Sequence, residues 1–195
     1  MSDHEVQVLA GDPARVATVL PGSGYTAAAP LLAYPSTALH DAGWTVRQVH
    51  WALAPSGDAG WARAREVYAA TLRDAVRAAP GAAHVVVAKS LGTLAMPAAL
   101  ELGMVGAWLT PVLDGSLASE VRAATAGLAA QHLLAGGTAD AMWDGALARA
   151  SRAKVLEVDG ADHALEVPGA WRRSLDALAE ITAAVELLAA SVAAS

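Results

Sequence analysis

The chain has 195 residues, a length that fits one domain with a sizeable buried core. Its net charge is −6 and it has no basic run, which argues against nucleic acid or an anionic membrane surface as the partner. Cysteine is absent, and this excludes a disulfide framework, a thiolate metal site and a cysteine nucleophile. No apolar run that is free of charges is long enough to span a membrane, and the N-terminus lacks the basic segment followed by an apolar segment that is typical of a signal peptide. We therefore expect a cytoplasmic protein without membrane insertion.

Apolar strand patterns alternate with helical patterns along the whole chain. Strands are predicted over residues 5–10, 15–20, 44–51, 84–88, 105–110, 131–135 and 154–158. Helices are predicted over 28–42, with Pro35 as a candidate break, and over 61–79, from the turn after 84–88 to 102, and over 117–126, 142–150 and 171–193. This order predicts an α/β fold over residues 1–195: a doubly wound, mostly parallel sheet with helices on both faces.

The fourth predicted strand carries the clearest motif. Three consecutive valines and Ala88 are typical of a buried parallel strand, and the turn that follows has Ser90 at its tip. A strand, a tight turn with serine and a helix form the nucleophile elbow, usually written G-x-S-x-G. Gly92 fits this pattern, and Ala88 replaces the first glycine with one extra methyl group. A serine in this position stands clear of the sheet, where an imidazole can take its proton.

Two further polar residues follow later strands of the predicted sheet. Asp140 comes after the strand over 131–135, and His163 comes after the strand over 154–158. Because ligands bind at the carboxyl ends of parallel strands, we expect both side chains to lie near Ser90. Taken alone, Asp140 could simply cap a helix, and His163 could be an ordinary loop residue. Asp114 is a rival acid, and Asp58, Asp144, Asp159 and Asp162 also lie near strand ends.

These segments together resemble a small, capless α/β-hydrolase of the serine hydrolase superfamily, over nearly the whole chain. Ala88-Lys89-Ser90-Leu91-Gly92 resembles the elbow of small bacterial hydrolases with lysine before the nucleophile, Gly136-Gly137-Thr138-Ala139-Asp140 the acid loop, and Gly160-Ala161-Asp162-His163 the histidine loop. The resemblance implies that Ser90 is the nucleophile, His163 the general base and then acid, and Asp140 the group that orients the imidazole. It implies no cofactor. Lys89, which replaces the histidine common at that position, is expected to be a solvated turn residue, and the alternative is that it raises the positive potential near an oxyanion.

The segment Pro21-Gly22-Ser23-Gly24-Tyr25 resembles the His-Gly-x-Gly oxyanion loop of that family, with Pro21 in place of histidine. The amides of Ser23 and Leu91 would then be the oxyanion donors, with Gly24 as the alternative to Ser23. Gly22, Gly24 and Tyr25 are candidates for the substrate pocket. The same glycines also match a relaxed dinucleotide-binding fingerprint. That interpretation requires a carboxylate at the end of the next strand, which here ends His50-Trp51.

The function that the resemblance implies is hydrolysis of an ester or related acyl bond through a Ser90 acyl-enzyme. The substrate would be a small acyl compound or an acylated partner. Residues 111–116 leave room for only a short loop where many relatives insert a cap, so we expect an open, shallow site. Turnover should fall at acid pH, because His163 must be neutral to accept the serine proton and histidine ordinarily titrates near pH 6.5. A non-enzymatic binding protein of the same fold and a dinucleotide-binding protein are the alternatives, and the oligomeric state is open.

Overall fold

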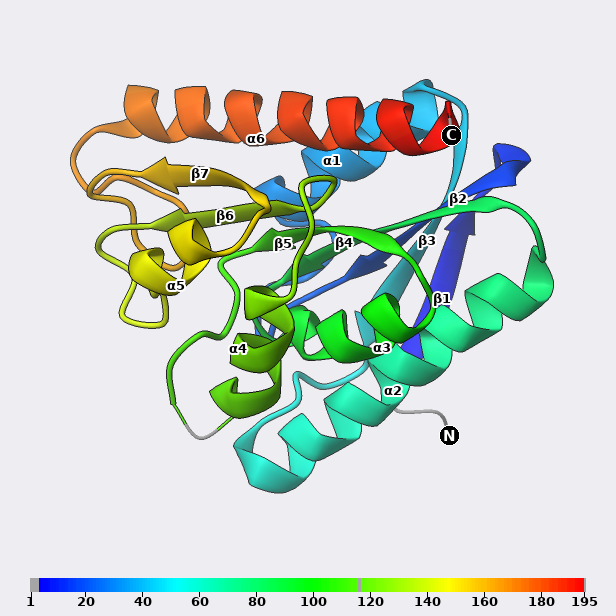
Figure 1. Cartoon of the computed structure of the whole chain (residues 1–195), viewed down its shortest axis with the longest axis horizontal. Coiled ribbons are helices and arrows are strands. Elements are labelled where there is room, and N and C mark those ends of the chain that lie inside the picture. The colour runs from blue at the N-terminus through cyan, green and yellow to red at the C-terminus, as the bar shows by residue number, and fades with distance from the viewer. Residues whose placement is uncertain (1–3, 116, 195) are drawn as a thin grey trace.

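A computed structural model describes residues 4–115 and 117–194, so Ser116 in the predicted short loop lies outside the described residues. A seven-stranded sheet runs through the middle of the molecule in the order β1-β3-β2-β4-β5-β6-β7 (Figure 1). The strands are β1 (His4–Leu9), β2 (Asp12–Leu20), β3 (Trp44–Trp51), β4 (Ala83–Lys89), β5 (Val105–Leu109), β6 (Leu133–Gly137) and β7 (Lys154–Val158). β1 pairs antiparallel with β3, and all other pairs are parallel. The predicted fold class is confirmed.

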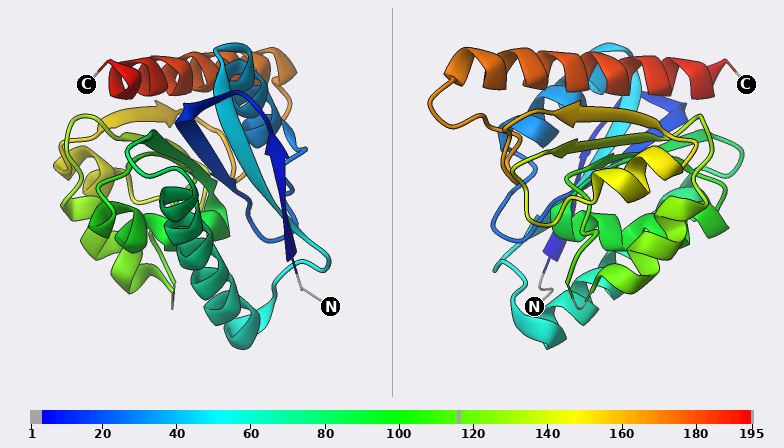
Figure 2. Two further views of the ribbon diagram at one scale, coloured as in Figure 1. Left: turned by 90° about the vertical axis from the view of Figure 1, so that its right-hand side faces the viewer. Right: turned by 60° about the vertical axis from the view of Figure 1, so that its left-hand side comes forward.

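Helices cover both faces of the sheet, as Figures 1 and 2 show. On one face, α1 (Pro30–Asp41) and the long α6 (Trp171–Ala193) pack on the strands and on each other. The other face is covered by α2 (Gly57–Ala78), the 3₁₀ helix η1 (Ser90–Ala95), α3 (Met96–Glu101), α4 (Ala118–Ala126) and α5 (Gly145–Ala150). None of the helices within the described residues is long and apolar enough to cross a membrane.

The central position of β4 in the sheet explains why residues 85–88 are all apolar. Val85 and Val87 pack in the cluster beneath α1 and α6, whereas Val86 and Ala88 pack in the cluster beneath α2 and α3. All four side chains are buried. Because both faces of the strand are covered over residues 85–88, apolar side chains are favoured at these four positions, and the run of β-branched residues follows.

The predicted break of the first helix at Pro35 is wrong. The residue lies inside α1, which is continuous from Pro30 to Asp41. Proline removes one intrahelical hydrogen bond. Here the helix is held by the burial of Leu31, Leu32 and Leu39 against the sheet, and Pro35 itself is buried with them.

The helix predicted after the elbow is a 3₁₀ helix followed by a short α-helix. Residues Ser90–Ala95 form η1, and α3 begins only at Met96. Pro97 has no N–H to donate to the carbonyl of Thr93, and the N–H of Met96 donates to that carbonyl instead. The bond spans three residues, which is the 3₁₀ pattern.

Candidate active site

The carboxyl ends of the parallel strands bring Ser90, His163 and Asp140 into one chain of hydrogen bonds. The Oγ of Ser90, directly after β4, lies 2.7 Å from Nε2 of His163. Nδ1 of the same ring lies 2.8 Å from Oδ2 of Asp140. His163 follows β7 and Asp140 follows β6, so the three groups come from separate strand ends. The spacing is that of a nucleophile, a base and a group that orients the base.

Ser90 stands on a strained turn. Its φ angle is 51°, in the left-handed region that non-glycine residues seldom adopt. A Cβ at Gly92 would collide with the carbonyl of Leu20 at the end of β2, so η1 can lie this close to the sheet only with glycine there. Gly22 also lies against Ser90, because a Cβ added there would be 3.1 Å from the serine Cβ, a tighter contact than most side chains make. Ala88, by contrast, packs in the core with its methyl group buried.

Close contact between two loops brings Asp140 to His163. A Cβ at Gly137 would collide with the carbonyl of Ala161, so the end of β6 lies directly against the histidine loop. The N–H of Ala139 donates to that same carbonyl over 3.0 Å. β6 ends at Gly137, two residues beyond the predicted end, and this places both glycines of the acid loop inside the strand.

Asp140 is the ionised partner that fixes the imidazole. Burial by itself raises the pKa of this carboxyl, but hydrogen bonds from His163 and from the N–H of Met142 outweigh it, and the net pKa is lowered. An ionised carboxylate only accepts hydrogen bonds, so Nδ1 carries the proton that it accepts. Nε2 is then free to accept the proton of Ser90. The Asp140 side chain is 2% exposed, and the His163 side chain is 36% exposed. The carboxylate is therefore shielded from water, whereas the imidazole is accessible from the solvent.

The other candidate acids make no hydrogen bond to His163 and interact with other groups. Asp114 is exposed, and its Oδ1 accepts the N–H of Gly115. Asp144 caps α5 through the N–H of Leu147 and pairs with Arg122. Asp162 accepts backbone N–H groups of its own loop, Asp159 lies near Thr138, and Asp58 lies in the first turn of α2. Of these groups, only Asp114 reaches the cleft beside Ser90, and it makes no hydrogen bond to His163.

The glycine loop after β2 is held rigidly. The hydroxyl of buried Tyr68 donates to the carbonyl of Pro21 over 2.6 Å and accepts from Nε1 of Trp51 at 3.0 Å. The hydroxyl of Ser23 donates to the carbonyl of Pro55 over 2.6 Å. The loop is therefore fixed at both sides of Gly22, beside Ser90.

Removing the Tyr68 hydroxyl should loosen this loop. In Tyr68→Phe, the Pro21 carbonyl and the Trp51 N–H lose a buried partner, so we expect the free energy of unfolding to fall by about 1–3 kcal/mol. Urea denaturation measures the change. Tyr34→Phe is the matched control, since this tyrosine is exposed on α1. Equal stability of Tyr68→Phe and the native chain would show that the hydroxyl does not hold the loop.

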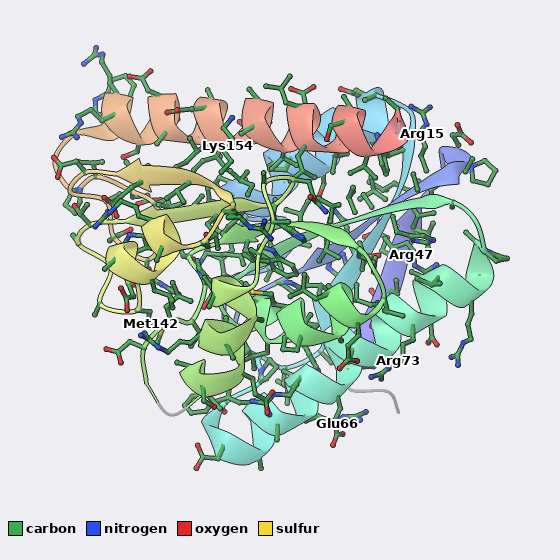
Figure 3. The ribbon with its side chains drawn as sticks, viewed as in Figure 1. Arg15, Arg47, Glu66, Arg73, Met142 and Lys154 are labelled. Carbon is green, nitrogen blue, oxygen red and sulfur yellow. The ribbon has the colours of Figure 1, made fainter. Side chains whose placement is uncertain are left out.

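A cleft of about 450 Å³ opens beside Ser90. Its walls combine polar and apolar side chains: Ser23, Ser56, Trp61, Leu91, Val112, Asp114, Gly115, Leu117, Met142 and His163. Met142, labelled in Figure 3, lies between β6 and α5. The structure thus places Ser23 and Leu91 with Ser90. Gly22, Gly24 and Tyr25 instead line a separate, smaller cavity of about 90 Å³.

Sequence reasoning missed most of the cleft walls. Trp61 and Leu117 belong to segments whose pattern indicates only the edge of a helix, and no motif marks them. Three other tryptophans do not line the cleft: Trp108 is buried in the core, Trp143 donates to Glu157, and Trp171 is exposed at the start of α6. No cluster of metal-ligating side chains occurs among residues 4–115 and 117–194.

The expectation that Lys89 is solvated is wrong. Its side chain is 2% exposed, and Nζ donates to the backbone carbonyl of His163 over 3.0 Å. Nζ also lies 4.5 Å from the centre of the Tyr25 ring. The prediction treated the residue as part of the turn, whereas it is the last residue of β4, and its side chain points beneath the histidine loop.

Comparison with known proteins finds similar folds and no similar sequence. No family model and no curated protein matches the chain. Its structure resembles that of an α/β serine hydrolase without a lid from Xanthomonas campestris, with a TM-score of 0.69 and 19% identity over 93% of this chain and 88% of that one. The structure of Est1E from Butyrivibrio proteoclasticus is similar with a TM-score of 0.72 and 13% sequence identity, over 98% of this chain and 95% of that one. The structure of a monoacylglycerol lipase from Paleococcus ferrophilus is similar with a TM-score of 0.63 and 11% sequence identity, over 94% of this chain and 100% of that one. At these identities the similarity establishes a shared fold along nearly the whole chain.

Proposed function

We propose that this chain, which has the α/β-hydrolase fold in a form without a lid, is a serine hydrolase that cleaves an ester or a related acyl bond. The observation that carries the proposal is the continuous hydrogen-bond chain from Ser90 through His163 to Asp140. A serine hydroxyl alone is a poor nucleophile, and this arrangement supplies the base that it needs.

The reaction follows from the positions of these groups. Nε2 of His163 takes the proton as Oγ of Ser90 attacks the acyl carbonyl carbon. The imidazolium then gives that proton to the leaving oxygen, and the alcohol departs from the acyl-enzyme. Water, activated by the same nitrogen, attacks the acyl carbon and releases the acid and free Ser90. Asp140 stays ionised throughout and stabilises the imidazolium.

The negative charge that develops on the carbonyl oxygen needs donors next to Ser90. The N–H of Leu91 lies in the first turn of η1, where backbone N–H groups have no partner within the helix. Ser23, on the rigid glycine loop, lines the same cleft as Leu91 and is the proposed second donor through its backbone N–H. The contacts of Pro21 and Ser23 hold this donor in place before substrate arrives.

The cleft bounds the substrate class. Its walls include Trp61, Val112 and Leu117, which suit an apolar acyl chain. We propose that the substrate carries a short acyl group, or an acyl chain presented by a larger partner.

A panel of p-nitrophenyl esters of graded acyl length tests the proposed function. We expect hydrolysis by the native chain, a preference for short or medium chains, and loss of nearly all of this hydrolysis in folded Ser90→Ala. Hydrolysis by Ser90→Ala at a rate close to that of the native chain would contradict the role of Ser90. Failure of every ester with the folded native chain would favour a binding protein of this fold.

A further inference from the structure

Lys89 is a buried cation that the mechanism above does not use. Apart from Lys154 it is the sole lysine of the sequence, and Lys154 lies exposed at the start of β7 (Figure 3). Burying an ammonium group is costly unless it is paired, and a well-packed apolar side chain of similar size usually serves stability as well or better. A buried lysine directly before Ser90 therefore requires an account other than stability.

The contacts of Lys89 join three parts of the site. Its backbone precedes the nucleophile on β4, and Nζ donates to the carbonyl of His163. The ammonium group faces the ring of Tyr25, next to the glycine loop. The charges that act on it are the carboxylates of Asp140 and Asp162. One side chain thus links the elbow, the histidine loop and the segment after β2.

The hydrogen bond from Lys89 is made to the main chain of the base, His163. His163 lies in a loop, and its ring must keep Nδ1 on Asp140 and Nε2 on Ser90 at the same time. A hydrogen bond to the carbonyl of His163 restricts the main-chain conformation of this residue, and so restricts where its ring can lie. The ammonium group also adds positive charge beside Asp140, which favours the ionised form of that carboxylate.

We propose that Lys89, in its charged form, is a positioning residue that holds the His163 main chain and keeps the base aligned between Ser90 and Asp140. The proposal rests on the proposed function, because it concerns the geometry of the same base. It makes activity depend on the charge of Lys89, because an ammonium group holds the carbonyl of His163 more strongly than a neutral amine does.

The groups that face Lys89 determine the expected pH dependence. They are Tyr25 from the segment after β2, Asp140 from the loop after β6, and Asp162 and His163 from the loop after β7. Burial lowers the pKa of Lys89 to about 8, against the opposing effect of the two carboxylates. Burial raises the pKa of Tyr25, which therefore stays neutral here. As pH rises through about 8, Lys89 loses its charge, and kcat should fall.

The experiment compares kcat against pH with the titration of Lys89 itself. Protein labelled with ¹³C at the lysine ε carbon gives two lysine signals, and Lys154→Met assigns them. The rate is measured with the best p-nitrophenyl ester, with Ser90→Ala as the blank. We expect the alkaline decline of kcat to follow the Lys89 signal. Lys154→Met should keep the native rate profile, since this lysine is exposed on β7.

Replacement of Lys89 separates positioning from simple packing. Lys89→Met keeps the volume and removes the charge, so we expect kcat to fall roughly 100-fold, with KM within about threefold and no decline near pH 8. Its melting temperature should be unchanged or higher, because a buried charge is removed. Lys89→Arg keeps a charge at all accessible pH values, so a folded variant should retain activity at alkaline pH.

Three outcomes would overturn the proposal. These are native kcat and pH profile in folded Lys89→Met, a native kcat that stays flat while the Lys89 signal titrates, and a loss of activity in Lys89→Met that only follows unfolding at the assay temperature. If Lys89→Arg does not fold, the comparison of Lys89→Met with the native chain still decides. Absence of Ser90-dependent hydrolysis in the native chain is a different result, which refutes the proposed function itself.

Discussion

Asp140→Asn should lower kcat for ester hydrolysis by on the order of 10⁴-fold, as the same change does in serine proteases, without unfolding the chain. An asparagine amide at this position can present N–H to Nδ1 of His163 and so favour the tautomer with its proton on Nε2. That nitrogen then cannot accept the proton of Ser90, although the distances stay nearly the same. Burial of Asp140 strengthens the effect, since water cannot replace the lost carboxylate.

Asp114→Asn is the matched control for this prediction. Asp114 follows β5 and lines the cleft, but it makes no hydrogen bond to His163, so kcat should change by only a few-fold. Stopped-time assays with one p-nitrophenyl ester, together with circular dichroism, measure both variants. A large loss in Asp114→Asn with little loss in Asp140→Asn would move the acid to the end of β5.

The second large effect concerns the nucleophile and the base together. Ser90→Ala and His163→Ala should each lower kcat by roughly 10⁶-fold, and the double variant should lose no more than either single variant. The two groups act as one unit, because Oγ of Ser90 is useful only while Nε2 of His163 can take its proton. Residual rate would come from binding and the oxyanion donors.

Rate measurements at high enzyme concentration check this prediction. The matched control is His40→Ala, since this histidine lies in the last turn of α1 and does not line the cleft. If the losses of the single variants multiplied in the double variant, Ser90 and His163 would not act as a unit.

Much of the fold could be predicted because its signals are local. The apolar run over residues 85–88 predicts β4, since a strand covered on both faces favours apolar side chains on both. The order of Ser90, Asp140 and His163 along the chain predicts their meeting, because parallel strands end at one edge of the sheet. The predicted helix ends are less accurate: α2 begins at Gly57, four residues before the predicted start. Gly57 and Gly60 are poor helix formers and make this segment resemble a loop, although Ser56 at the N-cap and Asp58 in the first turn are typical of a helix start.

The rest of the site depends on contacts between distant residues. The Tyr68 hydroxyl is recognisable as a support for Pro21 only when α2 and β2 are packed together. A lysine next to a turn is ordinarily solvated, so the sequence does not indicate that Lys89 is buried. Its burial depends on the loop after β7, which lies over it and accepts its hydrogen bond. Trp61 and Leu117 form cleft walls because α2 and the segment before α4 lie beside η1. None of these relations has a sequence spacing that could mark it.

Covalent labelling by a fluorophosphonate tests the central claim most directly. The probe reacts with a serine only when a base and oxyanion donors activate it, so no knowledge of the substrate is needed. Intact mass and peptide mapping should show one adduct per chain, located on Ser90, and none on folded Ser90→Ala. A folded native chain that takes up no probe, or a chain labelled equally with and without Ser90, would contradict the account.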